Sequence, residues 1–112
     1  MPVVHINCGK IHDWESFHIV FSETLGFPAF YGRNMNAWID CLTSLDSPDD
    51  GLTTVHCKPF DVLTIQLDDV ILLPDEVYEA IQDCAAFVNW RRLQVGESAV
   101  VAISCNRDKP VK

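Results

Sequence analysis

The sequence predicts a small α/β domain in which a three-stranded parallel sheet packs against helices. Three short apolar runs have the composition of strands: Val3 to Asn7, Val62 to Leu67, and Ala99 to Ser104. Helix-like segments separate these runs, and a helical crossover favours parallel pairing with a right-handed connection. The chain has 112 residues, 48% of them apolar, so one core can form. With so few strands, we expect the helices to cover one face of the sheet.

The first helix is predicted between Asp13, a residue type that caps helix N-termini, and Gly26, which suits a left-handed C-terminal position. Pro28 then prevents the helix from resuming. The apolar residues inside these limits recur at spacings of three and four: Trp14, Phe17, Phe21 and Leu25. This spacing places them on one buried stripe.

A second helix is expected after Asn34, a further N-cap residue type. At about 100° per residue, its side chains separate into two arcs. The apolar arc contains Met35, Trp38, Ile39, Cys41, Leu42 and Leu45. The opposite arc contains Asn36, Ala37, Asp40, Thr43 and Ser44. Asp40 lies near the centre of that outward arc.

The rest of the chain contains one long helix and several turns. Leu45 to Gly51 is rich in turn residues, and Leu52 to Cys57 is either a short edge strand or an extended loop. Pro74 starts a helix that runs towards Leu93 and ends before Gly96. We expect one domain over residues 1–105 and a polar C-terminal tail over residues 106–112.

The same periodicities predict the hydrophobic core. Its expected members are Val4, Ile6, Trp14, Phe17, Phe21, Leu25, Trp38, Leu42, Ile65, Ile81, Val88, Val100 and Ile103.

Composition narrows the function classes. With 16 acidic and 8 basic residues the net charge is −8, which disfavours contact with phosphate backbones or anionic lipid. We therefore expect no direct nucleic-acid or membrane binding, and a basic protein as partner. Five cysteines without a Cys-x-x-Cys pair are typical of buried thiols in a reducing compartment. No signal-like or membrane-spanning run occurs, so a cytoplasmic protein, monomeric when free, is expected.

Candidate catalytic groups do not converge in the sequence. The four histidines form no His-x-x-x-His pair and the glycines do not cluster, so we expect neither a metal nor another cofactor. Cys41 and His56 leave a small Cys/His hydrolase open, because such pairs meet only in space. Arg91 and Arg92 either hold an anion or complement a helix dipole. Two clusters of acidic residues are interpreted as solvated turns. They are Asp46, Asp49 and Asp50 in one loop, and Asp68 and Asp69 at the end of a predicted strand.

The most specific pattern is "FYGRNMNAWIDCLTSL", which resembles the barstar family, intracellular inhibitors of the ribonuclease barnase. The residues that carry the resemblance are Phe30, Tyr31, Gly32, Asn34, Met35, Ala37, Asp40, Cys41, Leu42 and Thr43. The resemblance implies a barstar-like fold and an inhibitor rather than an enzyme. It also implies that the second helix and the loop before it plug the active site of a nuclease, where an aspartate meets cations that otherwise hold RNA phosphate.

Carried onto this chain, the resemblance implies that Asp40 is the phosphate-mimicking acid. The partner-binding residues would be Phe30, Tyr31, Gly32, Asn34, Asn36, Ala37, Asp40, Thr43 and Ser44. The chain also departs from the family: Asn36 and Arg91 stand where, or near where, the family has further acids, and Phe30 lacks a tyrosine hydroxyl. Matching fails between Ser47 and Asp61. These departures count against barnase itself, so the expected target is a related nuclease or another toxin, and a barstar-like module with a non-nuclease partner is the alternative.

Overall fold

The sheet has the predicted three parallel strands. The computed structural model describes residues 2–105. Its strands are β1 (Val3–Asn7), β2 (Leu63–Asp68) and β3 (Val101–Cys105), in the order β1-β2-β3. Both pairs are parallel, with Ile6 opposite Leu67 and Ile65 opposite Ile103. The α/β fold with a small parallel sheet, predicted from the three apolar runs, is confirmed.

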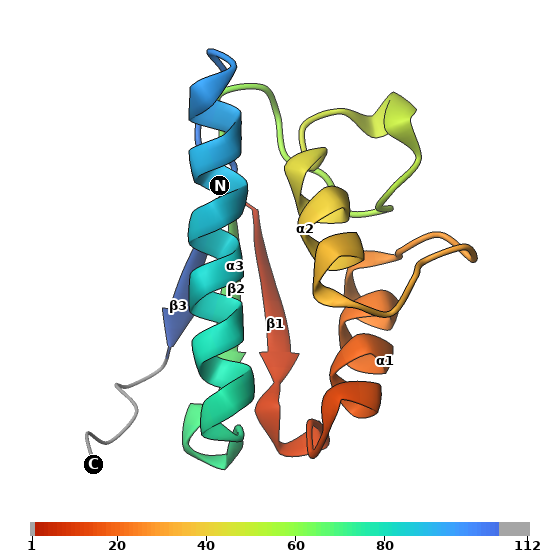
Figure 1. Cartoon of the computed structure of the whole chain (residues 1–112), viewed down its shortest axis with the longest axis vertical. Helices are drawn as coiled ribbons and strands as arrows, with labels where there is room; N and C mark the ends of the chain where they lie inside the picture. The colour runs from red at the N-terminus through yellow and green to blue at the C-terminus, as the bar shows by residue number, and fades with distance from the viewer. Residues whose placement is uncertain (1, 106–112) are drawn as a thin grey trace.

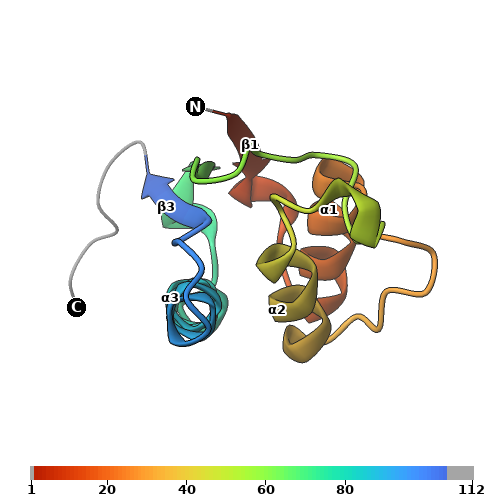
Figure 2. The same ribbon diagram turned by 90° about the horizontal axis from the view of Figure 1, so that it is seen from above.

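Three α-helices connect the strands. They are α1 (Trp14–Leu25), α2 (Met35–Thr43) and α3 (Asp75–Gln94). Short 3₁₀ turns follow β1, α2 and β2, namely η1 (Cys8–Lys10), η2 (Pro48–Asp50) and η3 (Val70–Leu72). The long helix α3 lies across the sheet in front of β2 and β3, and α1 and α2 lie beside it towards β1 (Figures 1 and 2). This arrangement leaves the outer side of α2 uncovered within residues 2–105.

The predicted limits of α1 are set by local chemistry. The Asp13 side chain accepts a hydrogen bond from the Ser16 backbone N–H, and Ser16 returns the contact in a capping box. Gly26 ends the helix at φ 68°. The Thr54 side chain packs against Gly26, so a Cβ at position 26 would overlap it. The Thr54 N–H also donates to the Leu25 carbonyl at 2.9 Å. Gly26 therefore allows the loop after α2 to dock against α1.

The observed core contains most of the predicted residues, and the exceptions are only partly buried. Ten of the predicted residues are buried: Ile6, Phe17, Phe21, Leu25, Trp38, Leu42, Ile65, Ile81, Val88 and Val100. Val4, Trp14 and Ile103 are only partly buried and pack against the core from outside. Trp14 stays near the surface because its indole N–H donates to Glu76 at 3.3 Å. Val4 and Ile103 are partly exposed because β1 and β3 are the edge strands of the sheet.

The segment after α2 is an extended loop, one of the two alternatives that the sequence left open; the other was a short edge strand. Leu52 to Cys57 forms no strand, and the Cys57 N–H donates to the Leu45 carbonyl at 3.0 Å. Thr53 and Cys57 point inward and are buried.

Among residues 2–105, no helix combines the length and the apolar character that a membrane span needs. The predicted tail over residues 106–112 lies outside the described part of the chain.

Candidate functional site

Helix α2 is a rigid platform with one buried and one open side. The Asn34 side chain accepts a hydrogen bond from the Ala37 N–H at 2.8 Å and so fixes the first turn. Trp38 and Leu42 are completely buried beneath the helix. The two-arc division predicted from the sequence is therefore correct, and Asp40 faces solvent.

The loop over residues 27–33 forms the second wall of the site. Tyr31 packs on Phe27 with ring centroids 4.5 Å apart, and its N–H donates to the Pro28 carbonyl at 2.9 Å. Its hydroxyl lies 2.6 Å from Nδ1 of His18, a buried residue of α1. These contacts hold Tyr31 in one position next to α2.

A groove of about 270 Å³ lies between this loop, α2 and the loop after η2. It is lined by Pro28, Phe30, Tyr31, Gly32, Ala37, Asp40, Cys41 and Leu52. The Phe30 side chain is largely exposed, with 78% of its surface accessible. An exposed ring and an exposed carboxylate therefore border one concave surface.

Small residues keep this groove open. A Cβ on Gly32 would lie 3.5 Å from the Ala37 Cβ and 3.3 Å from the Asn34 side-chain nitrogen. The second distance is tighter than ordinary van der Waals contact, so a side chain at position 32 would press on the cap of α2. Gly32 and Ala37 thus leave space in front of Asp40.

Asp40 has an intramolecular partner that the sequence did not reveal. Its Oδ1 accepts a hydrogen bond from Nη1 of Arg91 on α3 at 3.0 Å. The Asp40 side chain is 64% exposed and that of Arg91 is 40% exposed. An ion pair this open to water contributes only about 0–1 kcal/mol to stability. The carboxylate is therefore paired but remains available to a competing cation.

The protonation states around the groove do not favour nucleophilic chemistry. Burial, with a smaller effect from Asp40, raises the pKa of Cys41 to about 11, so its thiol is protonated at neutral pH. Burial also raises the pKa of Tyr31 and lowers that of His18. Nδ1 of His56 lies 3.3 Å from the Thr53 hydroxyl. Cys41 is a core cysteine rather than an activated one.

The other predicted binding residues lie outside the groove lining. The Asn34 side chain is the α2 cap, and the Thr43 hydroxyl donates to the Ile39 carbonyl at 2.6 Å. Asn36 is exposed on the outer side of α2, and Ser44 is a half-buried C-cap. Leu52 is a groove residue that the sequence did not reveal, because only the folding of the following loop brings it to α2.

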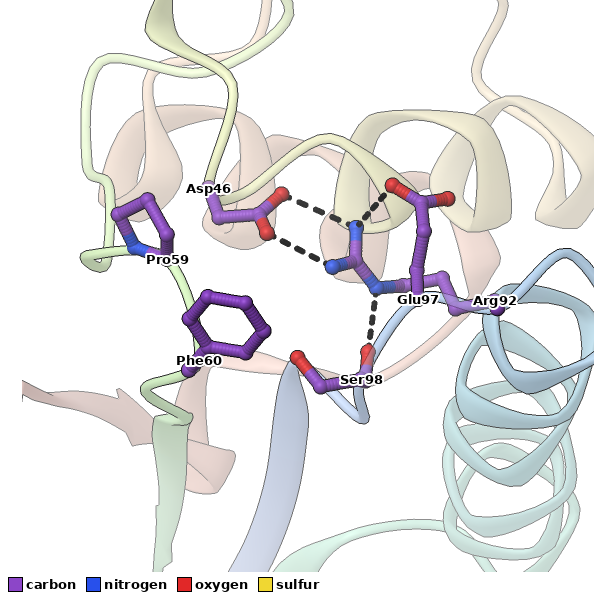
Figure 3. Close-up of a pocket in the computed structure, with 7 residues that line it drawn as sticks. Asp46, Pro59, Phe60, Arg92, Glu97 and Ser98 are labelled. Carbon is purple, nitrogen blue, oxygen red and sulfur yellow. Dashed lines mark hydrogen bonds and ion pairs between the residues drawn. The ribbon is translucent and has the colours of Figure 1, made fainter.

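A second hollow, of about 170 Å³, lies beyond the C-terminal end of α2 (Figure 3). Arg92 is only 3% exposed there. Its Nη1 donates to the Thr43 carbonyl at 2.7 Å, its Nη1 and Nη2 both contact the Asp46 carboxylate, and its Nε donates to the Ser98 carbonyl at 2.7 Å. The interpretation of Asp46 as a solvated turn residue is therefore wrong, since this loop needs an anion for the buried arginine.

An ion pair at the sheet accounts for a further acidic residue. Asp68 lies 3.0 Å from Nδ1 of His5 at the carboxyl end of the sheet. Among residues 2–105, no group of three or more His, Cys, Asp or Glu side chains is placed to hold a metal ion. The groove beside α2 is the candidate site, because five of its lining residues, Asp40 among them, are predicted binding residues.

The fold and this groove define a small α/β protein in which the open side of α2, an adjoining loop and an exposed carboxylate border one concave surface. The family described as Barstar (barnase inhibitor) matches residues 1–96. The chain belongs to the barstar family, as the motif around Asp40 indicated, and it is a barnase-inhibitor-like protein. Proteins of this family are inhibitors rather than enzymes. A comparison with curated proteins found no match.

Proposed function

We propose that this protein inhibits a ribonuclease or a related nuclease toxin and acts as the immunity protein of the cell that contains both. In this proposal α2 and the loop over residues 27–33 cover the active site of the toxin. The supporting observation is the exposed Asp40 carboxylate at the edge of a groove, on a helix whose other side is buried in the core.

The physical basis of inhibition is replacement of phosphate by a carboxylate. A nuclease active site holds the phosphate of RNA with cations, so it is concave and positively charged. Asp40 can occupy such a pocket with little loss of conformational entropy, because its helix is already fixed by the Asn34 cap and the Trp38 packing. No chemical step is required of the inhibitor.

The rings beside Asp40 supply apolar contact area. Tyr31 is held by His18 and the Phe30 ring is exposed beside it, and aromatic residues of this kind dominate binding energy at interfaces. The net charge of −8 adds a long-range attraction that raises the association rate with a basic toxin. Asn36, Thr43 and Ser44 would contribute polar contacts around this centre.

The proposal is tested by capture of the partner from the source cell, followed by an RNA-cleavage assay. We expect the captured protein to be a basic nuclease whose activity is lost on addition of one equivalent of the inhibitor. The loss should be weaker at high salt because charge steers the association. A captured partner that cleaves neither RNA nor DNA would overturn the proposal and favour a barstar-like binding module with another role.

A further inference from the structure

The Asp40 carboxylate is paired with a cation of its own chain, although the chain as a whole is acidic. The chain carries −8, yet the segment from Phe27 to Thr43 contains one carboxylate, Asp40, and one arginine, Arg33. Arg91 adds a second cation, whose Nη1 lies 3.0 Å from Asp40 Oδ1. Arg91 therefore places a positive charge directly beside Asp40. The net negative charge of the chain attracts a basic partner from a distance, but at the contact surface the partner meets both a carboxylate and an arginine.

The α3 surface beside Arg91 has the character of a contact region. Phe87 lies four residues before Arg91 on α3, so the two side chains are neighbours on the helix surface. Phe87 stacks on Trp90 with ring centroids 5.7 Å apart, and the two residues are 45% and 55% exposed. A partner that covers Asp40 and these rings also covers Arg91.

Covering Arg91 has an energetic consequence for the choice of partner. In the free protein its charge is balanced by Asp40 and water. In a complex, a cation of the target competes for Asp40, and Arg91 is then left desolvated unless the target also offers an anion. An unpaired, desolvated charge at an interface typically costs several kcal/mol, which is a strong basis for discrimination.

We propose that Arg91 is a specificity-determining residue that requires the target to carry an anionic group beside the cation that receives Asp40. The inference rests on the proposed function and specifies the chemistry of the partner, namely a basic nuclease with a carboxylate at the rim of its active site. Arg91 disfavours a target whose active site offers cations alone.

The nuclease captured from the source cell is the probe for this inference. Parent, Arg91→Gln and Arg91→Glu proteins are titrated with this nuclease by calorimetry. We expect at least tenfold weaker binding for Arg91→Gln, because the anion of the target loses its cation, and a larger loss for Arg91→Glu. Lys10→Glu is the matched control for Arg91→Glu, because it makes the same change in net charge on η1, away from α2. It should change the affinity much less.

The inference is overturned if neither Arg91 variant binds the captured nuclease more weakly than the parent. It is also overturned if Lys10→Glu weakens binding as much as Arg91→Glu does, since net charge alone would then explain the loss. The conservative Arg91→Gln change keeps the test valid if Arg91→Glu fails to fold. Failure of these variants would leave the proposed function intact, because that function is tested by the captured nuclease and by changes at Asp40.

Discussion

Two adjacent arginines of α3 reach towards α2 and have opposite environments. Arg91 makes one 3.0 Å contact with Asp40, and both side chains are substantially exposed. Arg92 is buried and satisfied by the Thr43 carbonyl, the Asp46 carboxylate and the Ser98 carbonyl. The outward pair is open to water and to competing ions, whereas the inward cluster fixes the end of α2. The comparison teaches that one step along a helix separates an exposed ion pair from a buried one on which the structure depends.

The largest expected effect is at the buried cluster. Arg92→Met should reduce the free energy of unfolding by about 3–5 kcal/mol, because it leaves the Asp46 carboxylate, only 13% exposed, without its cation. Urea unfolding of the variant measures this. The double variant Arg92→Met with Asp46→Leu should recover part of the loss, since the Asp46 charge is then no longer left unpaired, and Glu97, whose Oε2 lies 3.7 Å from Arg92 Nη1, is half exposed to water. A single variant as stable as the parent would contradict the structural role of Arg92.

The inward side of α2 should be nearly as sensitive. Leu42 is completely buried, and Leu42→Ala should cost about 2–5 kcal/mol by creating a cavity. Asn36→Ala, on the exposed side of the same helix, is the control and should change stability by less than about 0.5 kcal/mol. Equal effects in urea unfolding would mean that the two sides of α2 are assigned incorrectly.

Burial of His18, whose ring contacts the Tyr31 hydroxyl, should make stability depend on pH. Burial lowers the pKa of His18 below its ordinary value of 6.5, so the folded state disfavours the protonated ring. His18 therefore contributes stability above the unfolded-state pKa, and this contribution is lost as pH falls from about 6.5 through the lowered folded-state pKa.

His18→Gln should flatten the decline of melting temperature between about pH 7 and pH 5 relative to the parent. His12→Gln, at an exposed histidine just before α1, serves as the control and should keep the decline. The interpretation is wrong if the two variants have the same pH profile.

The smallest effect on folding should come from the outward pair. Arg91→Gln removes an exposed ion pair and should change the free energy of unfolding by at most about 1 kcal/mol. Urea unfolding beside Arg92→Met makes the comparison direct. A loss at Arg91 as large as that at Arg92 would show that the pair holds α2 and α3 together and is unavailable to a partner.

The parts of the fold that rest on local signals could be predicted from the sequence. Asp13, Gly26 and Asn34 mark helix ends by their own chemistry, and the two arcs of α2 follow from helical periodicity. The groove residues Phe30, Gly32, Ala37 and Asp40 were identified through the family motif rather than through spacing alone.

Long-range contacts could not be predicted. The Asp40–Arg91 contact joins residues 51 positions apart, and the Arg92–Asp46 contact joins residues 46 apart. Neither has a local signature, because a surface arginine and a buried one look alike in sequence. Leu52 reaches the groove only through the path of its loop, which carries no periodic pattern.

The most direct test of the account is binding of Asp40→Asn to the captured nuclease, measured by calorimetry beside thermal unfolding. The change keeps the shape of the side chain and removes its charge, so the variant should fold like the parent. Binding should weaken by on the order of a hundredfold or more, because the cations of the nuclease lose their anionic partner. Asp68→Asn, at the end of β2, should have a much smaller effect. If a folded Asp40→Asn protein binds as tightly as the parent, Asp40 does not replace phosphate in the nuclease and the central claim is wrong.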